Sequence, residues 1–163
     1  PTAVAYADGE YFVADAADGL VKVYDAQGAL VRSIGEDLKP QLTYVGWMAF
    51  DERGLIVADS NAGRVLVIDP ATGAQRAVFA DRYTLPRAVV PLGSTAVAVV
   101  DAFERAVSLT DAEGVRTESI DAQSVPQAPL ASPRGAAWHA EDARLYVTDA
   151  TGGRVIVFNV RLP

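Results

Sequence analysis

Four times along the chain, an apolar run ends at an aspartate and is followed by the same pattern of residues. The runs are YFVAD, LIVAD, VAVVD and LYVTD, and their final residues are Asp15, Asp59, Asp101 and Asp149. Six and eight residues after each aspartate stands Val or Leu, and ten residues after it stands Asp or Asn. Counted from Pro1, Tyr44, Pro86 and Pro133, successive repeats are 43, 42 and 47 residues long. A repeat of this length constrains the fold more strongly than any single motif does.

Each repeat is expected to form four short antiparallel strands. In the second repeat, the turn sequences DERG, SNAG and PATG separate the runs VGWMAF, LIVAD, RVLVID and RAVF. Short β-branched and aromatic runs between Asp, Asn, Pro and Gly clusters predict hairpins. No apolar spacing holds a period of 3.6 residues over three helical turns. The sequence therefore predicts an all-β fold with essentially no helix.

A unit of about 42 residues with four antiparallel strands is typical of a β-propeller blade. We therefore expect an all-β β-propeller built of four-stranded antiparallel blades, with about four blades present. Residues 1–163 form a single propeller region, with blades at approximately 1–43, 44–85, 86–132 and 133–163. The last blade is incomplete, because only VRLP follows its third strand.

The repeats resemble the NHL family of propeller repeats. The stretches VADSNAGRVLVID, VTDATGGRVIVFN and VADAADGLVKVYD are similar to the NHL pattern of a V-A-D strand end, a turn, an Arg and a second strand. The resemblance covers the whole chain and is strongest in the second and fourth repeats, where Arg64 and Arg154 match that Arg. The first repeat has Leu20 at this position and the third has Ala106. The resemblance implies a six-bladed propeller, which is longer than this chain.

An open row of blades would leave apolar faces and strand edges uncovered. Three explanations remain open on the sequence. The chain is part of a longer propeller, which we favour, or it completes a ring with another chain, or it closes as a four-bladed propeller. Because the chain begins at Pro1 and shows no signal-peptide pattern, we expect a processed or partial chain whose native targeting the sequence does not encode.

Composition excludes several classes of site. The chain has no Cys and one His, which excludes disulfides, Cys-ligated zinc and multi-His metal sites. Fourteen Lys and Arg against 21 Asp and Glu give a net charge of −7, which argues against nucleic acid as a partner. No apolar run approaches the ~20 residues of a membrane span. We expect no cofactor, no nucleic-acid binding and no membrane insertion.

The aligned aspartates and the matching arginines are expected to be structural. Each aspartate stands just before a tight turn, where its carboxylate can accept hydrogen bonds from backbone amides. Arg64 and Arg154 can bridge to a carboxylate of the same or an adjacent blade. The alternative is a ring of four acids that binds one cation. A structural role explains these residues better, because each repeat has one of them.

The aromatic residues and the single histidine also have structural interpretations. Tyr11 and Tyr146 precede the aligned aspartates and are predicted to pack between blades. Trp47 and Trp138 are predicted to do the same, with a place on the central channel as the alternative. His139 follows a first strand and is predicted to be an exposed turn residue.

The turns after the aligned aspartates and the links between blades are the expected place for binding. In propellers these loops gather at one side, and such loops usually carry function. The longest links span residues 35–44, 80–86 and 121–133. The candidate partner-contact residues are Asp18, Asn61, Phe103, Glu104 and Arg105. Phe103 is the most notable of them, because an aromatic residue in an exposed turn often marks a contact.

The leading hypothesis is a non-catalytic NHL-type propeller that acts as a protein-interaction scaffold or as a subunit of a larger assembly. Its partners would be another protein or neighbouring subunits, with a homo-oligomer among the options. One alternative is a lactonase- or lyase-like propeller enzyme with calcium or zinc at the channel, whose ligands lie on blades not present here. Another is channel binding of a glycan or peptide. The Ala-, Asp- and Arg-rich composition is similar to that of high-GC bacteria, which favours an exported bacterial protein.

Overall fold

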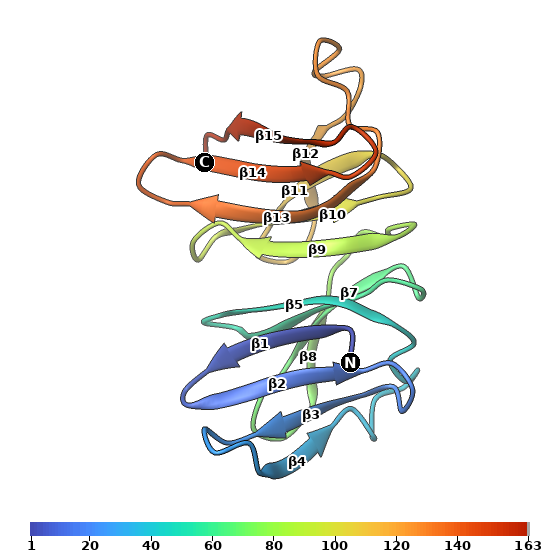
Figure 1. Ribbon diagram of the computed structural model, residues 1–163, viewed down its shortest axis with the longest axis vertical. Helices are drawn as coiled ribbons and strands as arrows, with labels where there is room; N and C mark the ends of the chain where they lie inside the picture. Colours follow the sequence, from blue (N-terminus) through green and yellow to red (C-terminus); the bar gives the residue numbers. More distant parts are fainter. Residues whose placement is uncertain (163) are drawn as a thin grey trace.

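The computed structural model describes residues 1–162, and every regular element in that range is a β-strand, which confirms the all-β prediction. The strands form four separate antiparallel sheets (Figure 1). The first sheet contains β1 (Ala3–Ala7), β2 (Glu10–Asp15), β3 (Leu20–Tyr24) and β4 (Leu30–Ile34). The second contains β5 (Val45–Asp51), β6 (Gly54–Asp59), β7 (Arg64–Ile68) and β8 (Gln75–Val78).

The third sheet contains β9 (Pro86–Pro91), β10 (Ala96–Asp101), β11 (Ala106–Asp111) and β12 (Arg116–Ile120). The fourth contains three strands, β13 (Pro133–His139), β14 (Arg144–Asp149) and β15 (Arg154–Asn159). In every sheet the strands follow one another in chain order, so each repeat builds one antiparallel meander. These sheets are the blades of a β-propeller fold.

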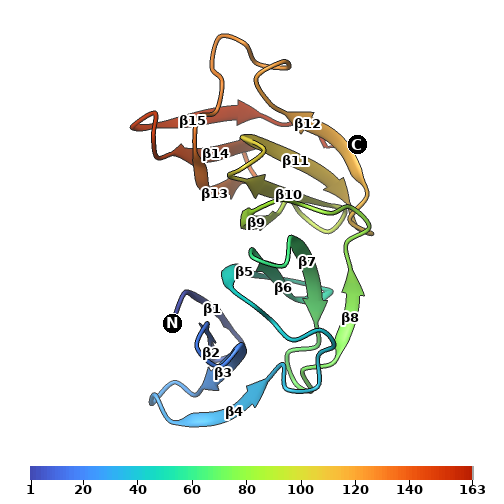
Figure 2. The ribbon, with the colours of Figure 1, turned by 90° about the vertical axis from the view of Figure 1, so that its right-hand side faces the viewer.

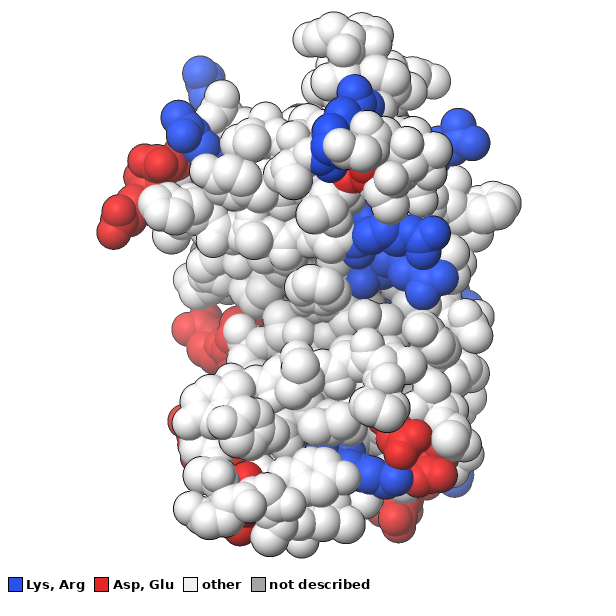
Figure 3. Space-filling view, viewed as in Figure 1, with Lys and Arg blue, Asp and Glu red and all other residues white. Residues whose placement is uncertain are grey.

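The four blades form an open arc (Figure 2). The first strands of neighbouring blades contact each other in succession, from β1 to β5, from β5 to β9 and from β9 to β13. These inner strands lie on the concave side of the arc, and the first and fourth sheets lie at its two ends (Figure 2). Seen from the inner-strand side, the surface is largely uncharged (Figure 3).

Burial follows the position of each blade in the arc. In β3, Val21 and Val23 are fully buried, whereas Lys22 and Tyr24 on the other face of the strand are only partly buried. All residues of β6 and β10 are buried, because these strands lie in blades that have a neighbour on both faces. Their sequences therefore read as continuous apolar runs rather than as an alternation.

Three apolar clusters hold the arc together, one between each pair of neighbouring sheets. The links between blades contribute to these clusters. Leu38 and Leu42 of the first link, Tyr83 of the second and Leu130 of the third are each at most 5% exposed. The links were expected to leave room for function, but part of each one fills the core instead.

Candidate functional site

The carboxylate of Asp59 joins three parts of the second blade. Its Oδ1 accepts hydrogen bonds from the Thr43 amide at 3.0 Å, the Thr43 hydroxyl at 2.6 Å and the Tyr44 amide at 3.1 Å. Its Oδ2 accepts one from Nε of Arg64 at 2.9 Å. The Asp59 side chain is fully buried and that of Arg64 is 6% exposed. Asp59 thus fastens the end of β6 to the segment that enters β5 and to the start of β7.

The carboxylate of Asp101 does the same in the third blade without an arginine. Its Oδ1 accepts hydrogen bonds from the amides of Phe103 and Glu104 at 2.9 and 3.0 Å. Its Oδ2 accepts hydrogen bonds from the amides of Thr84 and Leu85 at 2.7 and 3.0 Å. Four backbone amides therefore bind this buried carboxylate. Two of them belong to the turn between β10 and β11, so these hydrogen bonds hold that turn in place.

The fourth blade uses the same arrangement at its aligned aspartate, and the first blade uses only the part within the blade. Asp149 accepts hydrogen bonds from the Ser132 amide at 2.7 Å and from Arg154 at 3.2 Å. Burial raises the pKa of the Asp149 carboxyl, but the hydrogen bonds from the Ser132 and Ala131 amides and from Arg154 outweigh burial and leave the pKa below its usual value. Asp15 accepts hydrogen bonds from Lys22 and from the Ala17 amide, which lower the pKa of its carboxyl in that order.

These lowered pKa values predict a loss of stability in acid. Hydrogen bonds from the Thr72 amide and from Arg76 lower the pKa of Asp69 to about 2. A carboxyl whose pKa is lower in the folded state stabilises that state above its unfolded pKa of about 4, and this contribution disappears as the pH falls toward the folded value. We expect the melting temperature to fall between about pH 4 and pH 2. Calorimetric melts across this window test it, and Asp69→Asn should flatten the pH dependence; an unchanged slope would contradict the assignment.

The candidate partner-contact residues all lie in turns between the second and third strands of their blades. Asp18 is in the first blade and forms an ion pair with Lys22 at 2.6 Å. Asn61 is an exposed residue of the second blade. Phe103, Glu104 and Arg105 lie together in one turn of the third blade. These turns are at the same end of their sheets but belong to three successive blades. No ion pair or hydrogen bond in the described residues joins one of these turns to another.

The Phe103 turn combines exposure with a fixed backbone. The Phe103 side chain is 73% exposed, the largest value among the large apolar residues of the described chain. Arg105 has a φ of 55°, a left-handed conformation that is uncommon outside glycine. Glu104 accepts a hydrogen bond from the Thr84 hydroxyl at 3.2 Å and pairs with Arg116 at 3.6 Å. The arrangement presents an aromatic ring on a rigid support.

Arg116 belongs to this neighbourhood, and the sequence analysis did not find it. It lies at the start of β12, where its guanidinium is 5.7 Å from the centre of the Tyr83 ring and within ion-pair distance of Glu104. No pattern in the repeat marks this position. Only the folded structure brings the outer strand against the link before the blade.

A second candidate site is a hollow on the inner surface between the first two blades. It has a volume of about 340 Å³ and is lined by Thr2, Ala3, Val4, Gly46, Trp47 and Met48. Trp47 also packs against the two clusters that flank the third blade and lies beside Gly135 of β13. Both interpretations of Trp47 therefore hold, because the ring packs between blades and lines the inner surface. Trp138 packs against the cluster between the third and fourth blades.

The prediction that Tyr11 and Tyr146 pack between blades is wrong in this arc. Tyr11 is 44% exposed and lies 4.9 Å from the ring of Tyr6. Tyr146 is partly buried on the side of the fourth sheet that faces away from the third. Both residues lie on the outer face of an end blade, which no other sheet of residues 1–162 covers. His139 is an exposed residue at the end of β13, as predicted, with Nδ1 3.6 Å from the Asp142 carboxylate.

Within residues 1–162, no group of three or more His, Asp or Glu side chains is placed to hold a metal ion. The same part of the chain contains no helix that could span a membrane. The aligned aspartates are each in a different blade. Asp59, Asp101 and Asp149 bond to groups of their own repeat and of the link before it, and Asp15 bonds within its own repeat.

Comparison with known proteins supports the fold. No family model matches the chain, and no curated protein matches it. Among solved structures, the chain is similar to the computationally designed Ika4 protein, with a TM-score of 0.70 and 18% identity over 98% of this chain and 91% of that one. It is also similar to the computationally designed Ika8 protein, with a TM-score of 0.69 and 18% identity over 98% of this chain and 45% of that one.

The WD40 β-propeller domain of Doa1 gives a TM-score of 0.71 and 16% identity over 97% of this chain and 49% of that one. The chain therefore spans about half the length of the Ika8 and Doa1 chains. At these identities the likeness shows the fold alone. It confirms a β-propeller with about four blades present.

Proposed function

We propose that this chain is a non-catalytic NHL-type propeller region that binds a partner protein through the turns at one end of its blades. The propeller fold supports this proposal, since such folds hold loops on a rigid scaffold. The NHL-like repeats support the choice of family. The net charge of −7 favours a protein partner over nucleic acid.

The Phe103 turn is the single observation that carries the proposal. Exposing most of an aromatic ring to water is unfavourable, and large exposed aromatic residues are enriched where proteins bind each other. Because four amide hydrogen bonds to Asp101 hold the turn and the link before it, little backbone entropy would be lost when a partner covers the ring. Glu104 and Arg105 beside it would supply the polar rim of such a contact.

The proposal assigns no catalytic role to this chain. The single histidine, His139, lies beside the Asp142 carboxylate, and no hydroxyl is among its hydrogen-bond partners in the described residues. A calcium or zinc enzyme would need ligands on blades outside this chain. A chelator that lowers the melting temperature of a longer chain carrying such blades would favour that alternative.

The proposal predicts that Phe103→Ala together with Arg105→Ala weakens partner capture at least about tenfold, because contact hot spots contribute 2 kcal/mol or more. The chain would be immobilised, and captured proteins would be identified and titrated by mass spectrometry. The melting temperature should stay within about 2 °C of the original, because exposed side chains contribute little to stability.

The matched control is Val115→Ala together with Glu113→Ala, which removes one apolar and one charged exposed side chain from another turn of the same blade. The control should leave capture unchanged. Equal loss in both double variants would mean that the Phe103 turn is not the contact, and an unchanged capture by the first variant would refute the proposal.

The inner hollow favours a second candidate function, the binding of a glycan or peptide on the concave side. Trp47 lines this hollow beside small and apolar residues, and aromatic rings in such sites stack on apolar ligand faces. A panel of oligosaccharides and peptides would be titrated while tryptophan fluorescence is recorded. A saturable change that Trp47→Leu abolishes and Trp138→Leu retains would support this candidate.

A further inference from the structure

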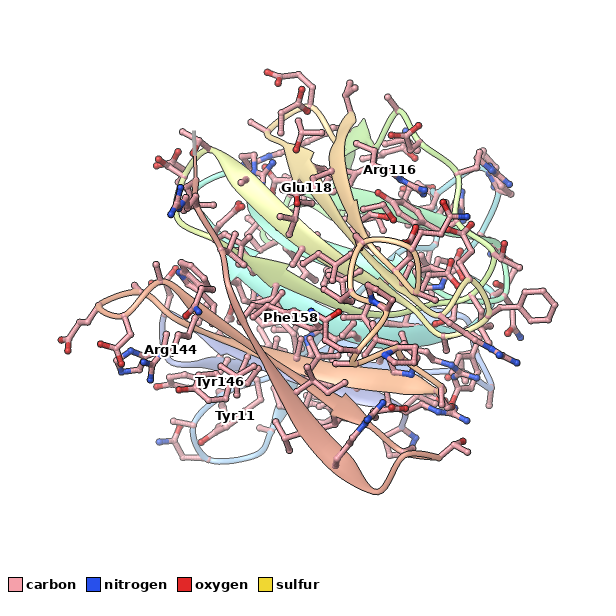
Figure 4. The ribbon with its side chains drawn as sticks, turned by 90° about the horizontal axis from the view of Figure 1, so that it is seen from above. Tyr11, Arg116, Glu118, Arg144, Tyr146 and Phe158 are labelled. Atoms are coloured by element: carbon pink, nitrogen blue, oxygen red, sulfur yellow. The ribbon has the colours of Figure 1, made fainter. Side chains whose placement is uncertain are left out.

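One face of the last sheet is exposed, whereas the equivalent face is buried in each of the other blades. Val155 and Val157 on this face of β15 are 57% and 47% exposed. The residues at the same two repeat positions are buried in the other blades, namely Val21 and Val23, Val65 and Val67, and Val107 and Leu109. The fourth sheet thus keeps the apolar side of a blade with no neighbour on it. Figure 4 looks down on this end of the molecule, with Arg144 and Tyr146 of β14 labelled.

The first blade has an exposed sheet face at the other end of the arc, on the side turned away from the second blade. Tyr6 pairs with Tyr11 and Tyr11 with Tyr24, so three tyrosines form a row across β1, β2 and β3. Tyr6 is 59% exposed. The matching row of the second sheet is Phe50, Leu55 and Ile68, and it packs against the first sheet.

The two uncovered faces match the two halves of the contact between the first and second blades. In that contact, the row Ala5, Phe12 and Val23 of the first sheet and the row Phe50, Leu55 and Ile68 of the second belong to one cluster. The rings of Phe12 and Phe50 lie 4.9 Å apart in an edge-on arrangement.

The uncovered row of the fourth sheet is Ala137, Tyr146 and Val157. This row has the same residue types as Ala5, Phe12 and Val23, the row of the first sheet that contacts the second blade. The tyrosine row of the first blade begins with an aromatic residue, Tyr6, as the row of the second blade begins with Phe50. The tyrosine row therefore occupies the positions from which the second blade contacts the first, with Tyr11 and Tyr24 where the second blade has Leu55 and Ile68.

We propose that the last blade of one copy of this chain binds the first blade of a second copy, head to tail, and that two such contacts close a ring of eight sheets. The chain carries both halves of the contact, so a second copy would bring each exposed face its complement. Charge also favours this pairing. Residues 1–43 contain seven acidic and three basic residues, whereas residues 133–163 contain three acidic and four basic residues. Head-to-tail contact joins opposite net charges, while head-to-head contact would join two acidic blades.

Ring closure distinguishes this pair from an open filament. A heterologous contact closes only when the rotation between copies completes a full turn. The chain covers 49% of the Doa1 WD40 propeller chain and 45% of the Ika8 chain, so chains about twice its length share its blade arrangement. Two copies supply eight sheets, which lies within the range of known propellers. The contact uses the sheet faces at the two ends, and it is independent of the Phe103 turn.

The test begins with native mass spectrometry of this chain at micromolar concentration, where we expect twice the covalent mass of 17.2 kDa. Val157→Asp places a charge in one half of the contact, and Tyr6→Asp places one in the other. Each should raise the dissociation constant at least about 100-fold, because every pair of such a variant loses both of its contacts. Phe103→Asp, at an apolar position outside the contact that is 73% exposed, is the control and should leave the pair intact.

Mixing the two variants gives the sharpest result. A mixed pair joins the unaltered first blade of the Val157→Asp copy to the unaltered last blade of the Tyr6→Asp copy. Equimolar mixing should therefore restore a pair held by one intact contact, which a mass tag on one variant identifies. Restoration also demonstrates that both variants fold.

Four results would overturn the proposal. A wild-type monomer would mean that the end faces are covered otherwise, as by further blades of a longer chain. A series of trimers and larger species would mean an open filament. Sensitivity to only one of the two variants would mean a contact between like blades, first to first for Tyr6→Asp or last to last for Val157→Asp. Failure of the mixture to pair, with both variants giving wild-type circular dichroism, would exclude the head-to-tail contact.

Discussion

Asp59→Ala is expected to lower the free energy of unfolding by about 3–5 kcal/mol. The substitution leaves the nearly buried guanidinium of Arg64 without its carboxylate, and removing one partner of a buried ion pair costs about that much. The amides of Thr43 and Tyr44 also lose their acceptor. For a chain of this size, each kcal/mol shifts the melting temperature by about 2–4 °C, so calorimetry should record a fall of about 6–20 °C.

Two further variants separate the causes of this loss. Asp25→Ala removes a half-buried aspartate that accepts hydrogen bonds from the amides of Gln27 and Ala29, and it should cost at most about 1.5 kcal/mol. Asp59→Asn keeps a neutral acceptor, so its free energy of unfolding should lie between those of Asp59→Ala and the wild type. If Asp59→Ala cost no more than Asp25→Ala, the buried carboxylate would not hold the blade together.

Gly114→Ala is expected to cost about 2–5 kcal/mol. Gly114 has a φ of +79°, and a Cβ at this position would lie 2.6 Å from Cα of Phe79 in the preceding blade and closer still to its side chain. An L-residue at such a φ costs about 1–2 kcal/mol. The overlap with Phe79 adds about 1–3 kcal/mol, because the outer parts of two blades must move apart. Urea denaturation would measure the loss.

Gly28 provides a matched control for this substitution. It occupies the same turn position in the first blade, with a φ of +81°, and nothing lies within 4 Å of a Cβ there. Gly28→Ala therefore carries the backbone cost alone, so the difference between the two variants measures the contact between blades. Equal losses in the two variants would contradict a tight contact at Phe79.

The sequence predicts the blades well because the information that defines them is local. The alternation in β3 places Val21 and Val23 on one face, and the structure buries both. The turn glycines and aspartates fall where the hairpins turn. Short-range hydrogen bonds and side-chain alternation determine these features, and both can be read from residues close together in the chain.

The sequence predicts less about residues whose environment depends on how the blades are arranged in the arc. Tyr11 has the right position for packing between blades, but in the first blade no neighbour covers that face. The pairing of Arg116 with Glu104 depends on how an outer strand crosses a link, and no spacing encodes it. The amide partners of Asp59 lie 15 and 16 residues before it, so the contact depends on how the link folds back against the end of β6.

The hydrogen bonds of the aligned aspartates have a consequence for how such a chain can lengthen. Asp59, Asp101 and Asp149 bond only within their own repeat and the link directly before it. A stretch of DNA that encodes one repeat with its preceding link therefore carries the complete fastening of a blade. Tandem duplication of that stretch would add a blade already fastened, and only the apolar faces would need to adapt afterwards. The position of one carboxylate in each repeat thus makes the repeat suited to growth by gene duplication.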